Sequence, residues 1–412
     1  MRVTIVDSDV SWPPTSGKRL RTLKLMLPLA REHQITYIGR GGRQGGANEA
    51  KAFFADHGIT PIIVNEPMVV NAGPKFYGRL AANLADPFPY SVRTHITPGM
   101  LEAVQASLAL NPPDLCQIEW VAYGYTLGAY RGPAVLQAHN VESLIWKRFA
   151  EAEANPLKRA FMRNQWRKFV RYEGEAFRRY DRVTVVSEAD RDLARTLYGE
   201  LPFDIVENGV DINYYKDVER RPDGRTILFV GSLDWRPNQD AVAVLLDSLF
   251  PAIRRLAPDA RLIIVGRNPP AGLAERVAAV EGVELAADVP DVRPYLARSA
   301  VLSVPLRIGG GSRLKILEAL AANVPVVSTA VGAEGLELEP GRQIDIADSV
   351  ESQAAALAAI LREPERAGAM ASAGRRAVEN RYDWSSIAAT LEKVWLGAAS
   401  RVNQCQKKRL FN

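Results

Sequence analysis

The stretch "VPLRIGGGSRLKILEALA" at residues 304–321 joins an apolar run to three consecutive glycines and then to a helix-like pattern. The glycines, which let a ligand approach the backbone closely, are Gly309, Gly310 and Gly311. Ser312 is a favourable N-cap, and the apolar positions after it recur at helical spacing: Leu314, Leu317 and Ala321. A helix start presents free N–H groups and the positive end of the helix dipole. The stretch therefore predicts a binding site for an anion such as phosphate.

Two charged residues fall on one face of this predicted helix. Lys315 lies in the first turn, and Glu318 follows three residues later, which places them about 4.5 Å apart along the axis. This offset suits a lysine that contacts a diphosphate and a carboxylate that accepts hydrogen bonds from neighbouring sugar hydroxyls. A capped surface helix with a Lys–Glu pair is the alternative that the spacing leaves open.

The stretch resembles the donor-binding segment of the retaining family four (group 1) glycosyltransferases, which have the glycosyltransferase-B fold. That family usually has two glutamates separated by seven residues. Glu318 matches the second, which holds the ribose in the family, whereas Gly310 stands in place of the first, which contacts the donor sugar. The sequence resembles instead a subgroup with a glycine-rich loop followed by "R-x-K-x-x-E-A". The resemblance implies that Arg313 and Lys315 stabilise the diphosphate together with the loop N–H groups.

Length and composition indicate an ordinary globular protein of two domains, with 412 residues, 47% hydrophobic and 24% charged. No apolar run approaches the ~20 residues of a membrane span. The chain begins directly with strand-like "RVTIVD", so we expect a cytoplasmic protein without a signal peptide. The two cysteines, Cys116 and Cys405, have no metal-binding spacing.

Strand-like and helix-like segments alternate along the whole chain, which predicts an α/β fold with parallel sheets. Together with the resemblance, this pattern predicts two facing, doubly wound Rossmann-like domains with a cleft between them. We expect an acceptor-binding domain at residues 1–215 and a donor-binding domain at 225–381. A C-terminal helix at 382–400 resembles the family's terminal helix, which crosses back to the first domain.

In the first domain, polar residues follow predicted strands, where ligands of such folds bind. His139 ends the strand "AVLQAHN", and the family often has a histidine there that faces the donor sugar; a satisfied core histidine is the alternative. Glu119, at the previous strand end, is a weaker candidate. Gly17 and Lys18 follow the first strand and would border the cleft on the acceptor side, although a plain loop–helix junction explains Gly17 equally well.

Asp7 and Asp9 invite a metal interpretation, because paired aspartates bind metal in the other main glycosyltransferase fold. We reject it, since Mg²⁺ or Mn²⁺ needs further oxygen ligands converging from elsewhere, and the two side chains can simply be solvated. The rest of the chain resembles the metal-independent fold.

In the second domain, the strand "TILFVG" leads into Gly231, Ser232 and Arg236. Family members place basic residues of this loop on the diphosphate, so Arg236 is a candidate, with a surface arginine as the alternative. Gly266 ends the next strand, where the nucleotide would pass close to the backbone. No strand is followed by G-x-G-x-x-G, which disfavours a nicotinamide or flavin enzyme, and we expect no cofactor.

The net charge of +5 is local, because residues 147–182 hold eleven Lys/Arg and five Asp/Glu. A general nucleic-acid binder is therefore not indicated. Within this segment four arginines recur every fourth residue: Arg159, Arg163, Arg167 and Arg171. Such a stripe can lie on an anionic membrane surface, or it can be a solvated face over a packed core.

These features predict a metal-independent, retaining glycosyltransferase that moves a sugar from a nucleotide-diphosphate sugar to a saccharide or lipid-linked acceptor, in surface polysaccharide or glycoconjugate synthesis. His139, Lys315 and Arg236 are the expected catalytic residues. We expect the protein in the cytoplasm, with peripheral attachment to the inner face of the membrane as an option. The alternatives are a non-catalytic nucleotide-sugar-binding subunit and a sugar-nucleotide epimerase or phosphorylase on the same fold.

Overall fold

The structure, a computed structural model, describes residues 1–41, 46–67, 69, 72–308 and 314–410, without the side chains of 401–410. It comprises two compact units. The first contains residues 1–207 and 385–412, and the second contains residues 208–384.

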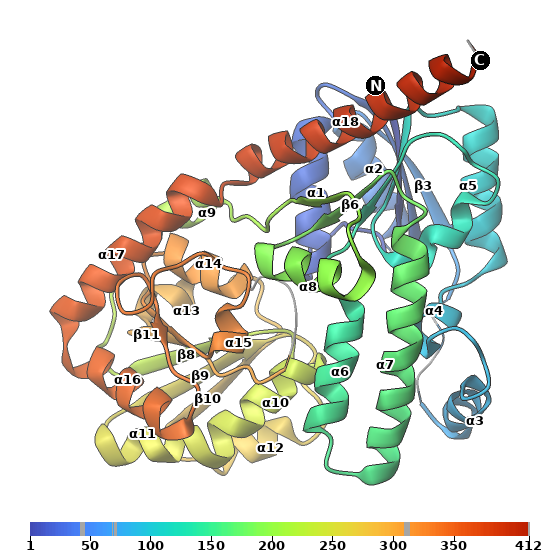
Figure 1. Cartoon of the computed structure of the whole chain (residues 1–412). Coiled ribbons are helices and arrows are strands. Elements are labelled where there is room, and N and C mark those ends of the chain that lie inside the picture. The colour runs from blue at the N-terminus through green and yellow to red at the C-terminus, as the bar shows by residue number, and fades with distance from the viewer. Residues whose placement is uncertain (42–45, 68, 70–71, 309–313, 411–412) are drawn as a thin grey trace. The chain divides into compact units, whose positions relative to one another are not determined.

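The first unit is built on a seven-stranded sheet in the order β3-β2-β1-β4-β5-β6-β7, with every neighbouring pair parallel (Figure 1). Its strands are β1 (Arg2–Asp7), β2 (Gln34–Gly41), β3 (Ile59–Asn65), β4 (Leu115–Ile118), β5 (Ala134–Gln137), β6 (Arg182–Val185) and β7 (Phe203–Ile205). The strand order reverses between β1 and β4, and ligands of doubly wound sheets bind at the carboxyl ends of the strands at such a point.

The helices of the first unit connect these strands or cover the sheet. They are α1 (Gly17–Leu29), α2 (Ala47–Asp56), α3 (Pro74–Asn83), α4 (Tyr90–Arg93), α5 (Pro98–Leu110), the 3₁₀ helix Val121–Leu127, α6 (Glu142–Ala152), α7 (Pro156–Phe177), α8 (Glu188–Tyr198) and α18 (Trp384–Leu410). Ser187 caps α8, because its hydroxyl accepts from the Asp190 N–H at 3.1 Å.

The chain between β5 and β6 forms two helices, α6 and α7, with a break between them. The break has a local cause. Pro156 is the first residue of α7, and a proline disfavours helical dihedrals in the residue before it. The Asn155 side chain then caps α7 by accepting from the N–H groups of Leu157 and Lys158. The two helices lie side by side (Figure 1).

The second unit repeats the same plan with a six-stranded, all-parallel sheet in the order β10-β9-β8-β11-β12-β13. Its strands are β8 (Thr226–Val230), β9 (Arg261–Gly266), β10 (Val283–Ala287), β11 (Val301–Val304), β12 (Val326–Ser328) and β13 (Asp345–Ile346). Its order reverses between β8 and β11. The two sheets confirm the predicted α/β, doubly wound class, whereas the cleft between the units stays a prediction.

The helices of the second unit are α9 (Ile212–Lys216), α10 (Arg236–Val244), a π-helical turn at Leu245–Leu249, α11 (Phe250–Leu256), α12 (Leu273–Ala278), α13 (Arg293–Arg298), α14 (Leu314–Ala321), α15 (Ala330–Ala333), α16 (Val350–Arg362) and α17 (Pro364–Arg381). In the described part of the chain, no helix combines the length and apolar character that crossing a bilayer requires.

Each sheet is the centre of its own core, because parallel strands covered on both faces bury successive side chains. In β1, Val3, Ile5 and Val6 are all buried, and in β9 four consecutive residues are, from Leu262 to Val265. Although α18 comes last in the sequence, its residues from Ser385 onward belong to the first unit. Figure 1 shows it beside α1, and the Trp395 side chain is fully buried.

Candidate functional site

In the second unit, a lysine and an asparagine meet at the carboxyl ends of β8 and β11. Lys315, in the first turn of α14, donates from Nζ to Asn238 Oδ1 at 2.9 Å, and its ammonium lies 4.6 Å from the centre of the Phe229 ring. Asn238, on α10, is 3% exposed and donates its amide N–H to the Ser232 carbonyl at 2.8 Å. The lysine is therefore held in one place at the edge of the sheet where ligands of this fold bind.

Glu318 lies one turn after Lys315 on α14 and is half-buried. Burial raises the pKa of its carboxyl, while a hydrogen bond with the Tyr215 hydroxyl and the positive charge of Lys315 act in the opposite direction. Tyr215, on α9, is itself 6% exposed. The arrangement holds a carboxylate next to a cation, which suits the predicted recognition of sugar hydroxyls beside a diphosphate.

Close packing at the carboxyl ends of β8 and β9 requires two glycines. A Cβ at Gly231 would lie 2.7 Å from the Asn238 amide nitrogen, and one at Gly266 would lie 2.1 Å from the Gly231 carbonyl oxygen. Ser232 accepts a hydrogen bond on its hydroxyl from Arg267 at 3.2 Å. The structure thus brings together Gly231, Ser232 and Gly266 with Lys315, as the sequence predicts for the donor side.

Arg236 is the first residue of α10. Its side chain is half-buried and follows Trp235, which is 40% exposed. Another nearby arginine, Arg307, makes a bidentate ion pair with Asp240 at 3.0 and 2.5 Å. The structure therefore places Arg236 on the loop that the resemblance implied, and its role on a diphosphate stays a prediction.

The remaining predicted donor residues lie outside the described residues. These are Gly309, Gly310, Gly311, Ser312 and Arg313. The described chain resumes at Leu314, the first residue of α14, so the predicted helix is present while its predicted cap is not part of the description.

In the first unit, buried charges gather after β1. The Lys18 ammonium forms an ion pair with Asp7, whose carboxylate also accepts from the Ser11 hydroxyl at 2.7 Å and the Tyr37 hydroxyl at 2.8 Å. Asp7 is fully buried, so the expectation that this side chain is simply solvated is wrong. Asp9 pairs with Arg19 at 2.6 Å. The described residues contain no cluster of three or more His, Cys, Asp or Glu that could hold a metal ion.

Glu119 and His139 follow β4 and β5, the next two strands of the sheet, and they lie in contact. Glu119 Oε2 is 3.2 Å from His139 Nε2, and both side chains are largely buried, at 3% and 12% exposed. Burial lowers the pKa of His139, which favours the neutral imidazole, against the opposing pull of Glu119. Burial would raise the pKa of Glu119, but His139, Lys18 and the Thr22 hydroxyl hold it well below its usual range.

Lys18 sits in the first turn of α1, which begins at Gly17 after the N-cap Ser16. Its side chain is 25% exposed, and burial lowers the pKa of its ammonium while the Glu119 charge opposes that shift. The structure thus assembles three residues that the sequence placed at separate strand ends: Lys18, Glu119 and His139. Glu119 was the weaker sequence candidate, yet it contacts His139 and its charge acts on Lys18.

Sequence reasoning missed Asn238 and Tyr215, the partners of Lys315 and Glu318. Asn238 follows Pro237 at a helix start, so its position was visible, but its contact with a residue 77 positions later was not. Tyr215 is the last residue of the first domain that the sequence predicted, at 1–215, and it packs instead into the core of the second unit.

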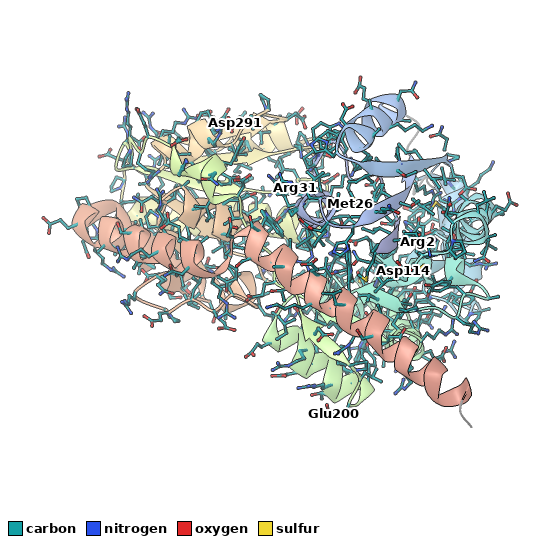
Figure 2. All side chains as sticks on the ribbon, turned by 90° about the horizontal axis from the view of Figure 1, so that it is seen from above. Arg2, Met26, Arg31, Asp114, Glu200 and Asp291 are labelled. Atoms are coloured by element: carbon teal, nitrogen blue, oxygen red, sulfur yellow. The ribbon has the colours of Figure 1, made fainter. Side chains whose placement is uncertain are left out.

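A hollow of about 730 Å³ lies at the amino-terminal ends of β1 and β2. Arg2 and Asp114 lie side by side in its wall, with Arg2 Nη2 3.4 Å from Asp114 Oδ1 (Figure 2). The hollow lies at the amino ends of the strands, whereas His139 and Lys18 follow carboxyl ends. None of the candidate residues lines it. The polar strand ends are therefore the candidate site of this unit.

Comparison with known families accounts for both units. A family model described as Glycosyl transferases group 1 matches residues 224–363, and one described as Glycosyltransferase Family 4 matches residues 29–214. The chain belongs to the group 1 glycosyltransferases. The match with the first model covers β8 to α16 and so includes Lys315 and Glu318, and the match with the second includes Glu119 and His139.

Two curated relatives are mannosyltransferases by name. The Mycobacterium tuberculosis GDP-mannose-dependent alpha-(1-6)-phosphatidylinositol monomannoside mannosyltransferase is 29% identical over 240 residues, covering 51% of this chain and 60% of the relative. The Xanthomonas oryzae GDP-mannose:cellobiosyl-diphosphopolyprenol alpha-mannosyltransferase is 26% identical over 217 residues, covering 50% of this chain and 56% of the relative. The matches thus span less than two thirds of either relative's length.

The fold agrees with that of solved glycosyltransferase structures. Anabaena HepE, crystallised in complex with UDP, superposes with a TM-score of 0.67 over 96% of this chain and 100% of its own, at 15% identity. This likeness shows that the two Rossmann-like units follow the glycosyltransferase-B fold, as the sequence resemblance implied.

Proposed function

We propose that the protein transfers a sugar from a nucleotide-diphosphate sugar to a saccharide or lipid-linked acceptor. The observation that carries this proposal is the constellation at the carboxyl ends of β8 and β11, where Lys315 and Glu318 lie one turn apart on α14. The Asn238 side chain holds Lys315, and the Tyr215 hydroxyl contacts Glu318. A cation beside a sugar-accepting carboxylate, over closely packed glycines, suits the diphosphate and ribose of such a donor.

In the proposed reaction, the bond between the anomeric carbon and the diphosphate oxygen breaks, and a bond to the acceptor hydroxyl oxygen forms. The hydroxyl proton leaves with the nucleoside diphosphate. Lys315 stabilises the negative charge that develops on the leaving group, with Arg236 and the loop N–H groups at 310–312 as further proposed donors. Glu318 anchors the ribose, and His139 contacts the transferred sugar. Retention of configuration and independence from metal are part of the proposal through the family resemblance.

GDP-mannose is the first donor to test, because both relatives named above use it. UDP-glucose is the second, since a protein with the same fold binds UDP. The named acceptors of the two relatives are lipid-linked, which supports an acceptor of that class and a place in glycoconjugate or polysaccharide synthesis.

The test is a thermal-shift series with UDP, GDP, ADP and their sugar conjugates on the wild type, Lys315→Ala and Glu318→Ala. Lys216→Ala, an exposed lysine of the same unit, is the matched control. A ligand at about 100 times its Kd should add roughly 2.7 kcal/mol of stability. We expect one nucleotide to stabilise the wild type and the control but neither site variant. No shift with any nucleotide would contradict the proposal, and binding without sugar transfer would favour the non-catalytic subunit.

We propose further that residues 147–182, which include the end of α6 and all of α7, rest on an anionic membrane surface where a lipid-linked acceptor is presented. Arg163, Arg167 and Arg171 are exposed on α7, and Leu157 at its start is 82% exposed. Basic side chains near an anionic surface contribute about 1 kcal/mol each, and an exposed leucine adds apolar contact.

Co-sedimentation with phosphatidylcholine vesicles, with and without phosphatidylglycerol, tests this surface. Replacing the three arginines by glutamine should weaken binding to anionic vesicles by roughly two orders of magnitude, as about 3 kcal/mol implies. The control replaces three exposed arginines of the second unit: Arg255, Arg261 and Arg342. Equal binding of the two triple variants would refute this docking face.

A further inference from the structure

The C-terminal helix supplies a buried hydrogen-bond donor to the middle of the first sheet. Trp395 on α18 is fully buried, and its indole Nε1 donates to Gln117 Oε1 at 2.6 Å. Gln117 lies in β4 and is 3% exposed. The two residues are 278 positions apart in the sequence.

The same glutamine continues the connection toward the candidate site. Its amide nitrogen donates to Glu119 Oε1, two residues further along the same face of the strand. The other Glu119 oxygen, Oε2, faces His139 Nε2 at 3.2 Å and accepts from the Thr22 hydroxyl at 2.8 Å. A continuous row of buried side chains thus leads from α18 to His139.

The donor-only indole and the acceptor-only carboxylate fix the directions of the hydrogen bonds in this row. An indole N–H can only donate, so Gln117 must turn its carbonyl oxygen toward Trp395 and its NH₂ toward Glu119. An ionised carboxylate can only accept, so the Glu119 oxygen that lies 3.2 Å from Nε2 favours the neutral His139 tautomer protonated at Nε2. This tautomer makes Nδ1 the acceptor nitrogen of the ring. Burial, together with the charges of Arg21 and Lys18, disfavours a second proton on the imidazole, against the opposing charge of Glu119.

We propose that Trp395 is a positioning residue, which sets the ring orientation and tautomer of His139 through Gln117 and Glu119. The inference rests on the proposed role of His139 at the transferred sugar. An Nδ1 acceptor in a fixed orientation can receive a hydrogen bond from one sugar hydroxyl, and a ring that flips or changes tautomer loses it. The docking of the C-terminal helix is then part of the candidate site.

The chain contains its own matched control. Trp384 opens the same helix and is 4% exposed, yet its indole N–H has no hydrogen-bond partner within the described structure. Trp395→Phe and Trp384→Phe therefore remove the same atoms from buried positions of one helix, but only the first removes a donor to Gln117. Gln117→Leu, which keeps the side-chain size, breaks the row at its second member.

The primary measurement needs no substrate. The chain has four histidines, so ¹⁵N-histidine spectra of the full-length protein are simple, and the His139 ring nitrogens are assigned with His139→Gln. We expect Trp395→Phe and Gln117→Leu to shift the His139 ring-nitrogen resonances, as Glu119→Gln also does, and Trp384→Phe to leave them in place. The double variant Trp395→Phe/Gln117→Leu should match Gln117→Leu alone, because both changes break one row.

The second measurement is sugar transfer with the donor found above. Losing one hydrogen bond to a buried acceptor should lower kcat about fivefold to tenfold in Trp395→Phe, with KM for the donor unchanged, while Trp384→Phe keeps the wild-type kcat. Unshifted His139 resonances in a folded Trp395→Phe protein, or additive effects in the double variant, would overturn the inference. Resonances that shift as expected in a protein without transferase activity would support the positioning role and contradict the proposed function.

Discussion

Outside the candidate site, the buried Glu173 and the half-buried Glu142 lie near each other at the start of α6. Glu173 accepts from the N–H groups of Glu142 and Ser143 at 2.7 and 2.9 Å, and from the Tyr198 hydroxyl at 2.7 Å. The Glu142 carboxylate accepts from the Trp120 indole N–H at 3.2 Å. Burial and the neighbouring Glu173 raise the pKa of Glu142 to about 7. This pair makes the stability of the first unit depend on pH.

We expect the first unit to lose stability between pH 5 and pH 8 through Glu142. A carboxyl whose pKa is near 7 when folded and near 4.5 when unfolded binds more protons in the folded state over that interval, so folding weakens as pH rises. Glu142→Gln removes this dependence while keeping an acceptor for Trp120. Urea unfolding should show the variant about 2 kcal/mol more stable relative to wild type at pH 8 than at pH 5. A pH-independent difference would contradict the assignment, and the exposed Glu102→Gln should show no such change.

At the candidate sites, the sequence predicted those residues whose side chains suit the proposed ligand and whose positions follow a local pattern. His139 after a strand and Lys315 with Glu318 on one helical face were visible, because periodicity and strand ends are local properties. Gln117 and Trp395 were not, since an apolar-strand glutamine and a helix tryptophan show no sign of a partner 278 positions away. Asp7 was misjudged for the same reason: its partners include Tyr37, on a neighbouring strand.

At the scale of elements, the ends of β8 and β9 approach each other through two glycines. Gly266→Ala should destabilise the second unit by about 2–3 kcal/mol, because its Cβ would lie 2.1 Å from the Gly231 carbonyl oxygen, a backbone atom that cannot move aside. Gly368→Ala is the control, since a Cβ at this position inside α17 meets nothing within 4 Å. It should stabilise the same unit by about 0.5–1 kcal/mol. Chemical denaturation measures both, and a Gly266→Ala protein as stable as wild type would refute the close approach.

Element types followed from the sequence better than element boundaries did. The strands were predicted from apolar runs such as "RVTIVD" and "RLIIVG", which appear as β1 and β9. The division between α6 and α7 was not predicted, although Asn155 and Pro156 carry the signal for a new helix start. Alternating strands and helices decide the fold class, whereas the end of a helix depends on a few caps and a proline.

At the scale of the whole molecule, the two parallel sheets were predictable because each strand is a short apolar run followed by a helix. The apolar runs alone do not determine the order in which the strands pair. It follows from the fold, which the resemblance supplied. The candidate residues also could be assigned to a unit in advance, while the contacts that hold them, such as Lys315 with Asn238, came only from the structure.

The division of the chain has a consequence for its synthesis. The first unit starts at residue 1 but needs Ser385 and the residues after it, whereas the second unit is complete by Trp384. On a ribosome, the second unit can therefore finish folding while the first still lacks its last helix. The polar side chain of Gln117 in β4 therefore lacks its Trp395 donor until residue 395 has been synthesised. Such a long-range contact forms late in folding, so a chaperone that shields β4 would protect the unfinished first unit.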